Sequence, residues 1–153
     1  MRRLALLAGL LFSALPASAT NWTEIQRVES VIERLGARVY WMRVNTGPCA
    51  RRGVLGLYMF APRTVYMCQQ TIARSGEPII HTLQHEGWHA AQHLCNNNQP
   101  ILPWSKVNAL LTNDDRQNLR LYPDSQLALE SEARALERIP AQAWINGFYH
   151  YCS

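Results

Sequence analysis

The stretch PIIHTLQHEGWHAAQHLC, residues 78–95, carries the pattern around which the rest of the chain is interpreted. Its centre, the run HEGWH from His85 to His89, fits the pattern H-E-x-x-H. Two histidines four residues apart on a helix lie on the same face, about one turn (~5.4 Å) apart, so both can bind one zinc ion. Glu86 lies beside them, where a carboxylate can accept a proton from a water molecule and pass it to a leaving amine.

The residues on both sides of this motif favour a helix. Pro78 suits the first turn of a helix, where its missing N–H costs nothing, and no further proline occurs before Pro100. Apolar residues recur through the stretch at spacings that a helix allows, and the polar run of residues 96–99 then ends it. The sequence therefore predicts a helix from about Pro78 to Cys95.

Two more histidines continue the four-residue spacing. His81 and His93 place a stripe of imidazoles along the predicted helix. Across eight helical residues, such as His81 to His89, the distance is about 12 Å, too far for ligands that each lie ~2 Å from one metal ion. Only His85 and His89 bracket Glu86. We therefore expect His81 and His93 to be surface residues or to support the ligands from outside.

The beginning of the chain resembles a secretory signal peptide. Arg2 and Arg3 precede an apolar run over residues 4–15, and a small-x-small site, Ala17-Ser18-Ala19, follows. We expect residues 1–19 to be removed, leaving residues 20–153 as one domain in the periplasm or outside the cell. No other apolar run has the length of a membrane-spanning helix.

The amino-acid composition and net charge indicate which kind of binding partner to expect. The chain has 153 residues, of which 48% are hydrophobic and 17% charged, which suits one globular domain. Without residues 1–19 its 13 basic and 11 acidic residues leave a net charge of +2, which gives no case for nucleic-acid binding. We expect a monomer that acts on a peptide or protein.

The four cysteines are even in number, which in an exported chain predicts two disulfides. We favour Cys49–Cys68, between neighbouring strands, and Cys95–Cys152, between the end of the motif helix and the C-terminal tail. No C-x-x-C spacing occurs, so the sequence gives little support for zinc binding by these cysteines.

The remaining patterns predict an α+β fold, in which a small antiparallel sheet lies between an N-terminal helix and the later helices. Residues 22–35 have helical spacing and end at Gly36, whereas β-branched and aromatic residues mark three strands. The second and third strands should form a hairpin. The strands are expected at residues 37–45, 54–60 and 64–69, and the later helices at 105–111, 124–138 and 141–149.

A catalytic zinc ion needs a third protein ligand and one open position. The longer pattern with a third histidine is absent, so a glutamate from a later helix is the candidate, within residues 130–137, ESEARALE. Here residues 53–138 resemble the short gluzincin-type zinc metallopeptidases. In those families a small sheet leads into the H-E-x-x-H helix, and a later helix supplies a glutamate from an E-x-x-A stretch. Many of them carry Asp or Asn four residues after that glutamate, where this chain has Arg134 or Leu136.

Two glutamates compete for this position. The spacing in the resembling families points to Glu130, whereas the helical wheel places Glu132 within the apolar face, where a buried carboxylate needs a partner. We expect the zinc ligands to be His85, His89 and Glu130, with Glu132 as the alternative. Glu137 is expected to be a surface charge paired with Arg134.

The expected function is zinc-dependent hydrolysis of peptide bonds, with Glu86 as the catalytic base. The alternatives are a zinc-stabilised binding domain without activity and a hydrolase of peptidoglycan amide cross-links. The strand around residues 56–58 could bind an extended peptide along its edge. Four side chains could stabilise an oxyanion by their chemistry: Tyr122, Tyr149, His150 and Tyr151.

Overall fold

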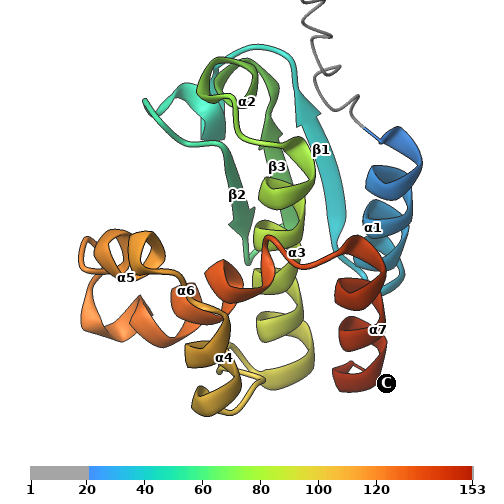
Figure 1. Cartoon of the computed structure of the whole chain (residues 1–153). Coiled ribbons are helices and arrows are strands. Elements are labelled where there is room, and N and C mark those ends of the chain that lie inside the picture. Colours follow the sequence, from blue (N-terminus) through green and yellow to red (C-terminus); the bar gives the residue numbers. More distant parts are fainter. Residues whose placement is uncertain (1–20, 153) are drawn as a thin grey trace, which may run out of the picture.

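The computed structural model describes residues 21–152, and the predicted signal peptide lies outside that range. The described part is α+β, as expected: an N-terminal helix comes first in the chain, three strands that form one sheet come next, and a series of helices follows (Figure 1). The elements in chain order are α1 (Trp22–Arg34), β1 (Arg38–Met42), the 3₁₀ turn η1 (Gly47–Ala50), β2 (Gly56–Met59), β3 (Thr64–Cys68), α2 (Gln69–Ser75), α3 (Ile79–Asn96), α4 (Trp104–Leu110), α5 (Asn113–Leu119), α6 (Asp124–Leu136) and α7 (Ala141–Tyr151).

The sheet is mixed, and the prediction of an antiparallel sheet is wrong for one of its strands. β2 and β3 form the expected antiparallel hairpin, but β1 pairs with β3 in parallel, in the order β1-β3-β2. The reason lies in the connection between β1 and β2. Residues 43–55 cross over the end of β3 and are fastened there by the disulfide Cys49–Cys68. β2 therefore reaches the outer edge, and β3 enters between the two earlier strands.

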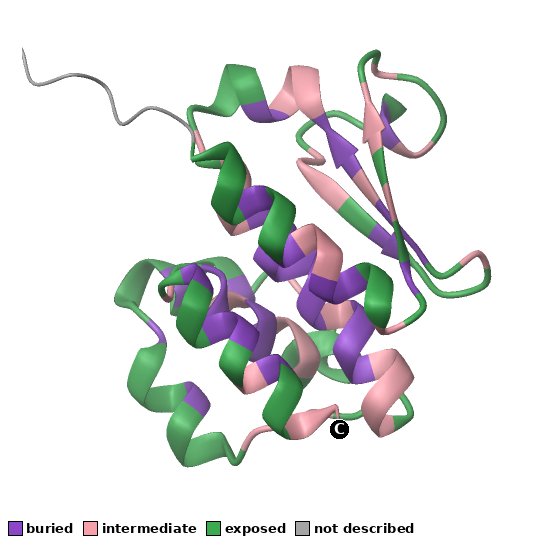
Figure 2. Cartoon of the chain, turned by 90° about the vertical axis from the view of Figure 1, so that its right-hand side faces the viewer, coloured by how far each residue is buried: buried purple, intermediate pink, exposed green. Residues whose placement is uncertain are grey.

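The helices lie on one side of the sheet, and the motif helix α3 is the central one (Figures 1 and 2). The main core is formed by α1, α3 and α7 with the inner face of the sheet. Gly87 allows α1 to approach α3 closely, because a Cβ atom there would lie 2.5 Å from Cδ1 of Ile32. Trp88 and Trp144 stack edge-on at 5.9 Å beneath the motif. The helix that carries the motif is thus held by packed aromatic and aliphatic side chains.

Both ends of α3 agree with the prediction from sequence. Pro78 precedes its first residue, and Asn97 stops it in the left-handed conformation with φ of 49°. The disulfide Cys95–Cys152 joins its last turn to the end of α7, so both predicted disulfides are confirmed. Within the described residues, no helix combines the length and the apolar character needed to cross a bilayer.

A second, smaller core lies between α4, α5 and α6. The sequence did not predict α5, whose composition is charged. It is stabilised at its start by a capping box, in which Thr112 accepts a hydrogen bond from the backbone N–H of Asp115, and the Asp115 carboxylate accepts one from that of Thr112. This helical layer supports α6 from the side opposite α3.

Candidate metal centre

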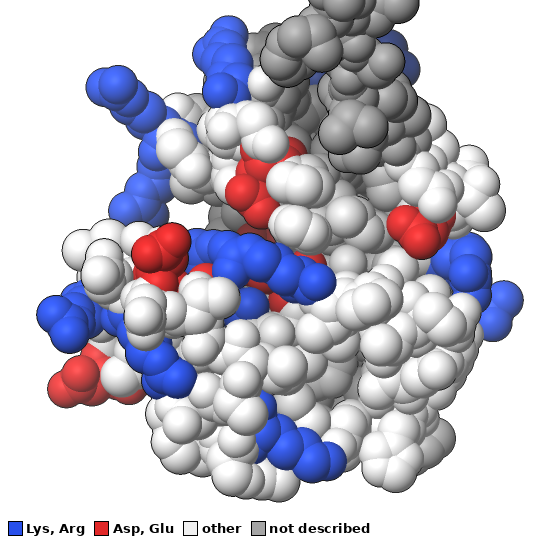
Figure 3. All heavy atoms as spheres, in the orientation of Figure 1, with Lys and Arg blue, Asp and Glu red and all other residues white. Residues whose placement is uncertain are grey.

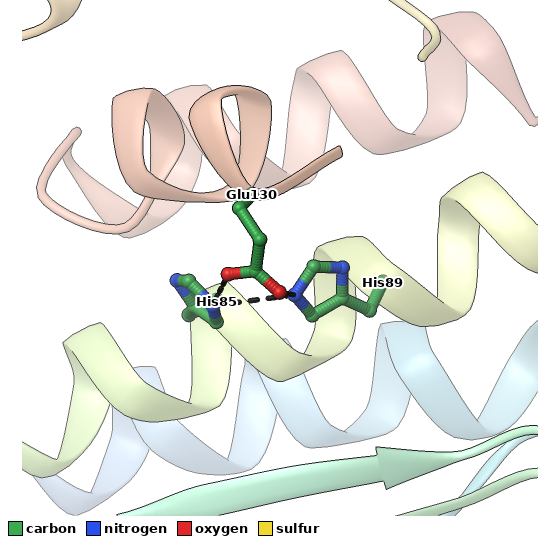
Figure 4. A group of neighbouring side chains, drawn as sticks. All are labelled: His85, His89 and Glu130. Carbon is green, nitrogen blue, oxygen red and sulfur yellow. Dashed lines mark hydrogen bonds and ion pairs between the residues drawn. The ribbon is translucent and has the colours of Figure 1, made fainter. Parts of the chain in front are cut away.

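Three predicted ligands come together between α3 and α6. His85 and His89 project from adjacent turns of α3, and Glu130 projects toward them from α6 (Figure 4). The two Nε2 atoms lie 3.2 Å apart, and each lies 3.4 Å from one oxygen of the Glu130 carboxylate. Their ligand atoms all lie within 4.8 Å of one another, which is the geometry of a group that could hold a metal ion.

The donor atoms fit such an ion. Two imidazole nitrogens and one carboxylate are the ligands of a common type of catalytic zinc site. Oε2 of Glu130 is buried and has no hydrogen-bond partner among the described residues, which is costly for a carboxylate unless a cation lies beside it. The three side chains together can therefore coordinate a metal ion, and imidazole and carboxylate ligands of this kind are shared by several divalent metals.

The other ring nitrogen of each histidine is also held. Nδ1 of His85 lies 2.9 Å from Oε2 of Glu137, and Nδ1 of His89 lies 2.8 Å from Oε1 of Gln92. Such partners fix the orientation of the ring and turn its Nε2 toward the position that a metal ion would occupy. The prediction that Glu137 is a surface charge is wrong, since only 4% of it is exposed.

Glu137 reaches His85 from the end of α6. It lies seven residues after Glu130, about two helical turns, and so returns to the same side as the metal group. Its carboxylate also pairs with Arg134, as predicted, and with Arg138 at 2.9 Å. The helical spacing from Glu130 was the signal in the sequence that could have identified it.

Glu132, the alternative ligand, has a different role. Its carboxylate is fully buried and accepts hydrogen bonds from the amide of Gln92 and from the backbone N–H groups of Ile101 and Leu102. The buried carboxylate of Glu132 is thus satisfied by the loop after α3. Of the two candidate glutamates, Glu130 is the one that lies beside the histidines.

The two remaining histidines of the stripe are outside the metal group. Nδ1 of His81 lies 2.8 Å from a carboxylate oxygen of Glu77, and Nδ1 of His93 lies 2.9 Å from the hydroxyl of Tyr58. Both agree with the expectation that they are not ligands.

Glu86 lies beside the metal group and faces the sheet edge. Its Oε2 accepts a hydrogen bond of 2.8 Å from the backbone N–H of Tyr58 in β2. Gly56 of the same strand makes this approach possible, because a Cβ atom there would lie 2.7 Å from Cγ of Glu86 and 2.8 Å from Cγ2 of Thr82. The edge strand and the motif helix together fix the carboxylate.

The charges of the site are strongly coupled. Burial lowers the pKa of His85, but Glu130, Glu137 and Glu86 outweigh burial and raise that pKa to about 9. Burial raises the pKa of Glu130, yet the two histidines outweigh it and bring that pKa well below its usual range. For Glu137 burial likewise acts upward, and His85 with the two arginines brings its pKa down. The site therefore favours negative carboxylates that face a cationic centre.

Two hollows meet at this group. One, of about 270 Å³, is polar and includes Glu77, His81 and Arg134. The other, of about 480 Å³, includes Leu57, Phe60 and Leu129. Their shared lining consists of Val54, Gly56, His85, Glu86 and Tyr122. In Figure 3 acidic and basic side chains lie against one another across the middle of the molecule.

Of the four candidate oxyanion donors, Tyr122 is the one that lines both hollows. Burial and the charge of Glu130 raise its pKa, so its hydroxyl keeps its proton at neutral pH. Tyr149 instead accepts a hydrogen bond from Arg34, and Tyr151 from Lys106. Neither they nor His150 line the hollows beside the metal group.

Comparison with protein-family models, with curated proteins and with solved structures finds no match for this chain.

Proposed function

We propose that this protein is an exported zinc-dependent peptidase. The observation that carries the proposal is the convergence of His85, His89 and Glu130, with the carboxylate of Glu86 beside this group but outside it, where it could act as a base. Three protein ligands with an adjacent carboxylate are typical of catalytic zinc sites, whereas structural sites are closed by four ligands. A structural site would have no use for Glu86.

A bound zinc ion would supply Lewis acidity, polarising the carbonyl of the scissile bond and making a water molecule more acidic. Glu86 would accept the proton of that water at the carboxylate and return it to the departing nitrogen. The N–H of Tyr58 holds one oxygen of Glu86, which keeps the other free to take the proton. The hydroxyl of Tyr122 would donate to the oxyanion.

The substrate would lie along β2. This strand forms the outer edge of the sheet, and two residues that line both hollows, Gly56 and Glu86, bring that edge against the motif helix. An extended peptide can pair through its backbone with the groups of a strand edge that remain unbonded, here those other than the Tyr58 N–H that Glu86 accepts. Such pairing would hold a peptide bond above the metal group without requiring a particular side chain.

The first test replaces Glu86 by glutamine, which keeps the size of the side chain and removes the base. We expect Glu86→Gln to retain the metal and to lose at least ~100-fold in hydrolysis of casein, the usual contribution of a general base. Glu33→Gln, at an exposed position of α1, is the matched control and should keep full activity.

Other outcomes distinguish the alternatives. Hydrolysis by Glu86→Gln at the parent rate would contradict the mechanism. Release of fragments from purified cell wall, with casein left intact, would instead identify a hydrolase of peptidoglycan amides. A parent protein that binds zinc and cleaves neither material would be a zinc-stabilised binding domain.

A further inference from the structure

Positive charge is concentrated in the part of the chain that builds the sheet. Residues 34–76 contain seven arginines and neither a lysine nor an acidic residue. The other described residues contain eleven acidic and six basic side chains. The modest net charge of the whole chain therefore hides a strongly basic region beside an acidic one. All seven arginines are exposed, and among the described residues none of them forms an ion pair.

The sheet in this region has one face that the helices do not cover (Figure 2). The strand register places Tyr40, Tyr66 and Leu57 side by side in one row across it, and Arg38, Thr64 and Met59 in the next. Tyr40 is 58% exposed, Leu57 39% and Met59 38%. We call this surface the open sheet face: it combines two tyrosine rings and the side chains of Leu57 and Met59 with the guanidinium group of Arg38.

Four of the other arginines stand at the two ends of the open sheet face. Arg63 lies in the turn between β2 and β3, and its carbonyl accepts the backbone N–H of Arg38. Arg43, Arg51 and Arg52 lie in the connection between β1 and β2 at the opposite end. In Figure 3 a group of basic side chains without acidic neighbours projects at the upper left, where Figure 1 shows this connection.

We propose that the open sheet face docks on a membrane surface that contains anionic phospholipids. Guanidinium groups bind phosphate through paired hydrogen bonds, and basic residues close to an anionic bilayer add to its attraction. Tyrosine suits the boundary between headgroups and acyl chains, because its ring is apolar and its hydroxyl is polar. Leu57 and Met59 add apolar surface that a purely ionic partner would not need.

An acidic protein would satisfy the arginines equally well. The membrane is favoured because exposed apolar side chains project from a short open sheet that has arginines at both of its ends. Arg51 and Leu57 also line the larger hollow beside Glu86. Docking would therefore bring one rim of the candidate active site to the membrane surface.

The test is sedimentation with lipid vesicles, using the chain from residue 20, which contains every residue of both cores. The apolar run of residues 4–15 is left out because it would itself partition into lipid. One set of vesicles is pure phosphatidylcholine, and the other contains about 30% phosphatidylglycerol. We expect binding to the second set only, and its loss in high salt.

Two pairs of variants locate the surface. Since each basic residue near an anionic membrane adds about fivefold to binding, Arg51→Gln with Arg52→Gln should weaken it by about 25-fold. Lys106→Gln with Arg120→Gln removes the same charge elsewhere and should have a much smaller effect. Tyr40→Ser with Leu57→Ser should also weaken binding, whereas Leu121→Ser, at a position 84% exposed, should not.

Three results would overturn the proposal. The first is equal sedimentation with both kinds of vesicle. The second is an equal loss of vesicle binding in the Arg51/Arg52 variant and in the Lys106/Arg120 variant. The third is binding to soluble polyglutamate without binding to vesicles, which would indicate an acidic protein partner. Circular dichroism of each variant separates a change of surface from a loss of folding. The outcome is independent of the proposed peptidase activity.

Discussion

Replacing Gly56 by alanine should disable the proposed base without disturbing the metal ligands. The added Cβ atom would lie 2.7 Å from Cγ of Glu86 and 2.8 Å from Cγ2 of Thr82. Carbon atoms in contact are ordinarily ~3.5–4.0 Å apart, so Glu86 must move by about 1 Å. Its hydrogen bond with the N–H of Tyr58 would then be strained or lost.

A displacement of about 1 Å at a catalytic group can cost on the order of 100-fold in rate. We therefore expect Gly56→Ala to lower kcat by about 100-fold while one metal ion per chain stays bound. Overpacking should also destabilise the fold by roughly 1–3 kcal/mol. The assay is casein hydrolysis, measured together with metal content and thermal unfolding.

Gly147→Ala is the matched control, since a Cβ atom at Gly147 in α7 has no atom within 4 Å. Alanine in a helix is, moreover, more stable than glycine by roughly 0.5–1 kcal/mol. This variant should keep its activity and unfold at the same temperature or slightly higher. Full activity in Gly56→Ala would refute the reasoning that Glu86 must stay in its place against β2.

Three further predictions concern the support of the site and of the fold. Glu137→Gln removes the charged partner of His85 and should weaken zinc binding about 10- to 100-fold in a chelator competition, whereas unchanged affinity would contradict a supporting role. Gly87→Ala would press on Ile32 and should lower the free energy of unfolding by about 1–3 kcal/mol, so a denaturant midpoint equal to that of the parent would be inconsistent with the packing. Burial raises the pKa of Asp115, but its hydrogen bonds outweigh this and lower that pKa, so its contribution to stability is present above pH ~4 and lost as pH falls below. The difference in stability between the parent and Asp115→Asn should shrink in acid, and a constant difference would speak against it.

The sequence predicted the motif helix and the convergence of His85, His89 and Glu130 more reliably than the sheet. The spacing of His85 and His89 is local, because any helix brings residues four apart together. The two disulfides could be predicted from the even number of cysteines and from the elements expected to lie next to one another. The direction of β1 relative to β3 could not be predicted from the sequence. The connection of residues 43–55 allows β2 to lie at either edge of the sheet, and the choice is settled only when β3 is placed between β1 and β2.

The error on Glu137 has a related cause. A wheel of α6 shows which residues share a face but not which neighbouring helix covers that face. Glu132 and Glu137 are both buried, yet Glu132 faces the loop after α3 and Glu137 faces His85. Short helices with charged sequences were missed for another reason. α5 depends on the cap formed by Thr112 and on its packing against α6, and neither produces an apolar period.

The central claim is that His85, His89 and Glu130 hold one metal ion. The most direct measurement is the metal content of the purified protein by elemental analysis, beside His85→Ala, Glu130→Ala and, as the matched control, Glu24→Ala on the exposed side of α1. The account predicts about one zinc ion per chain in the parent and the control, and none in the other two. A parent without metal, or a Glu130→Ala variant that keeps its zinc with parent affinity, would contradict it.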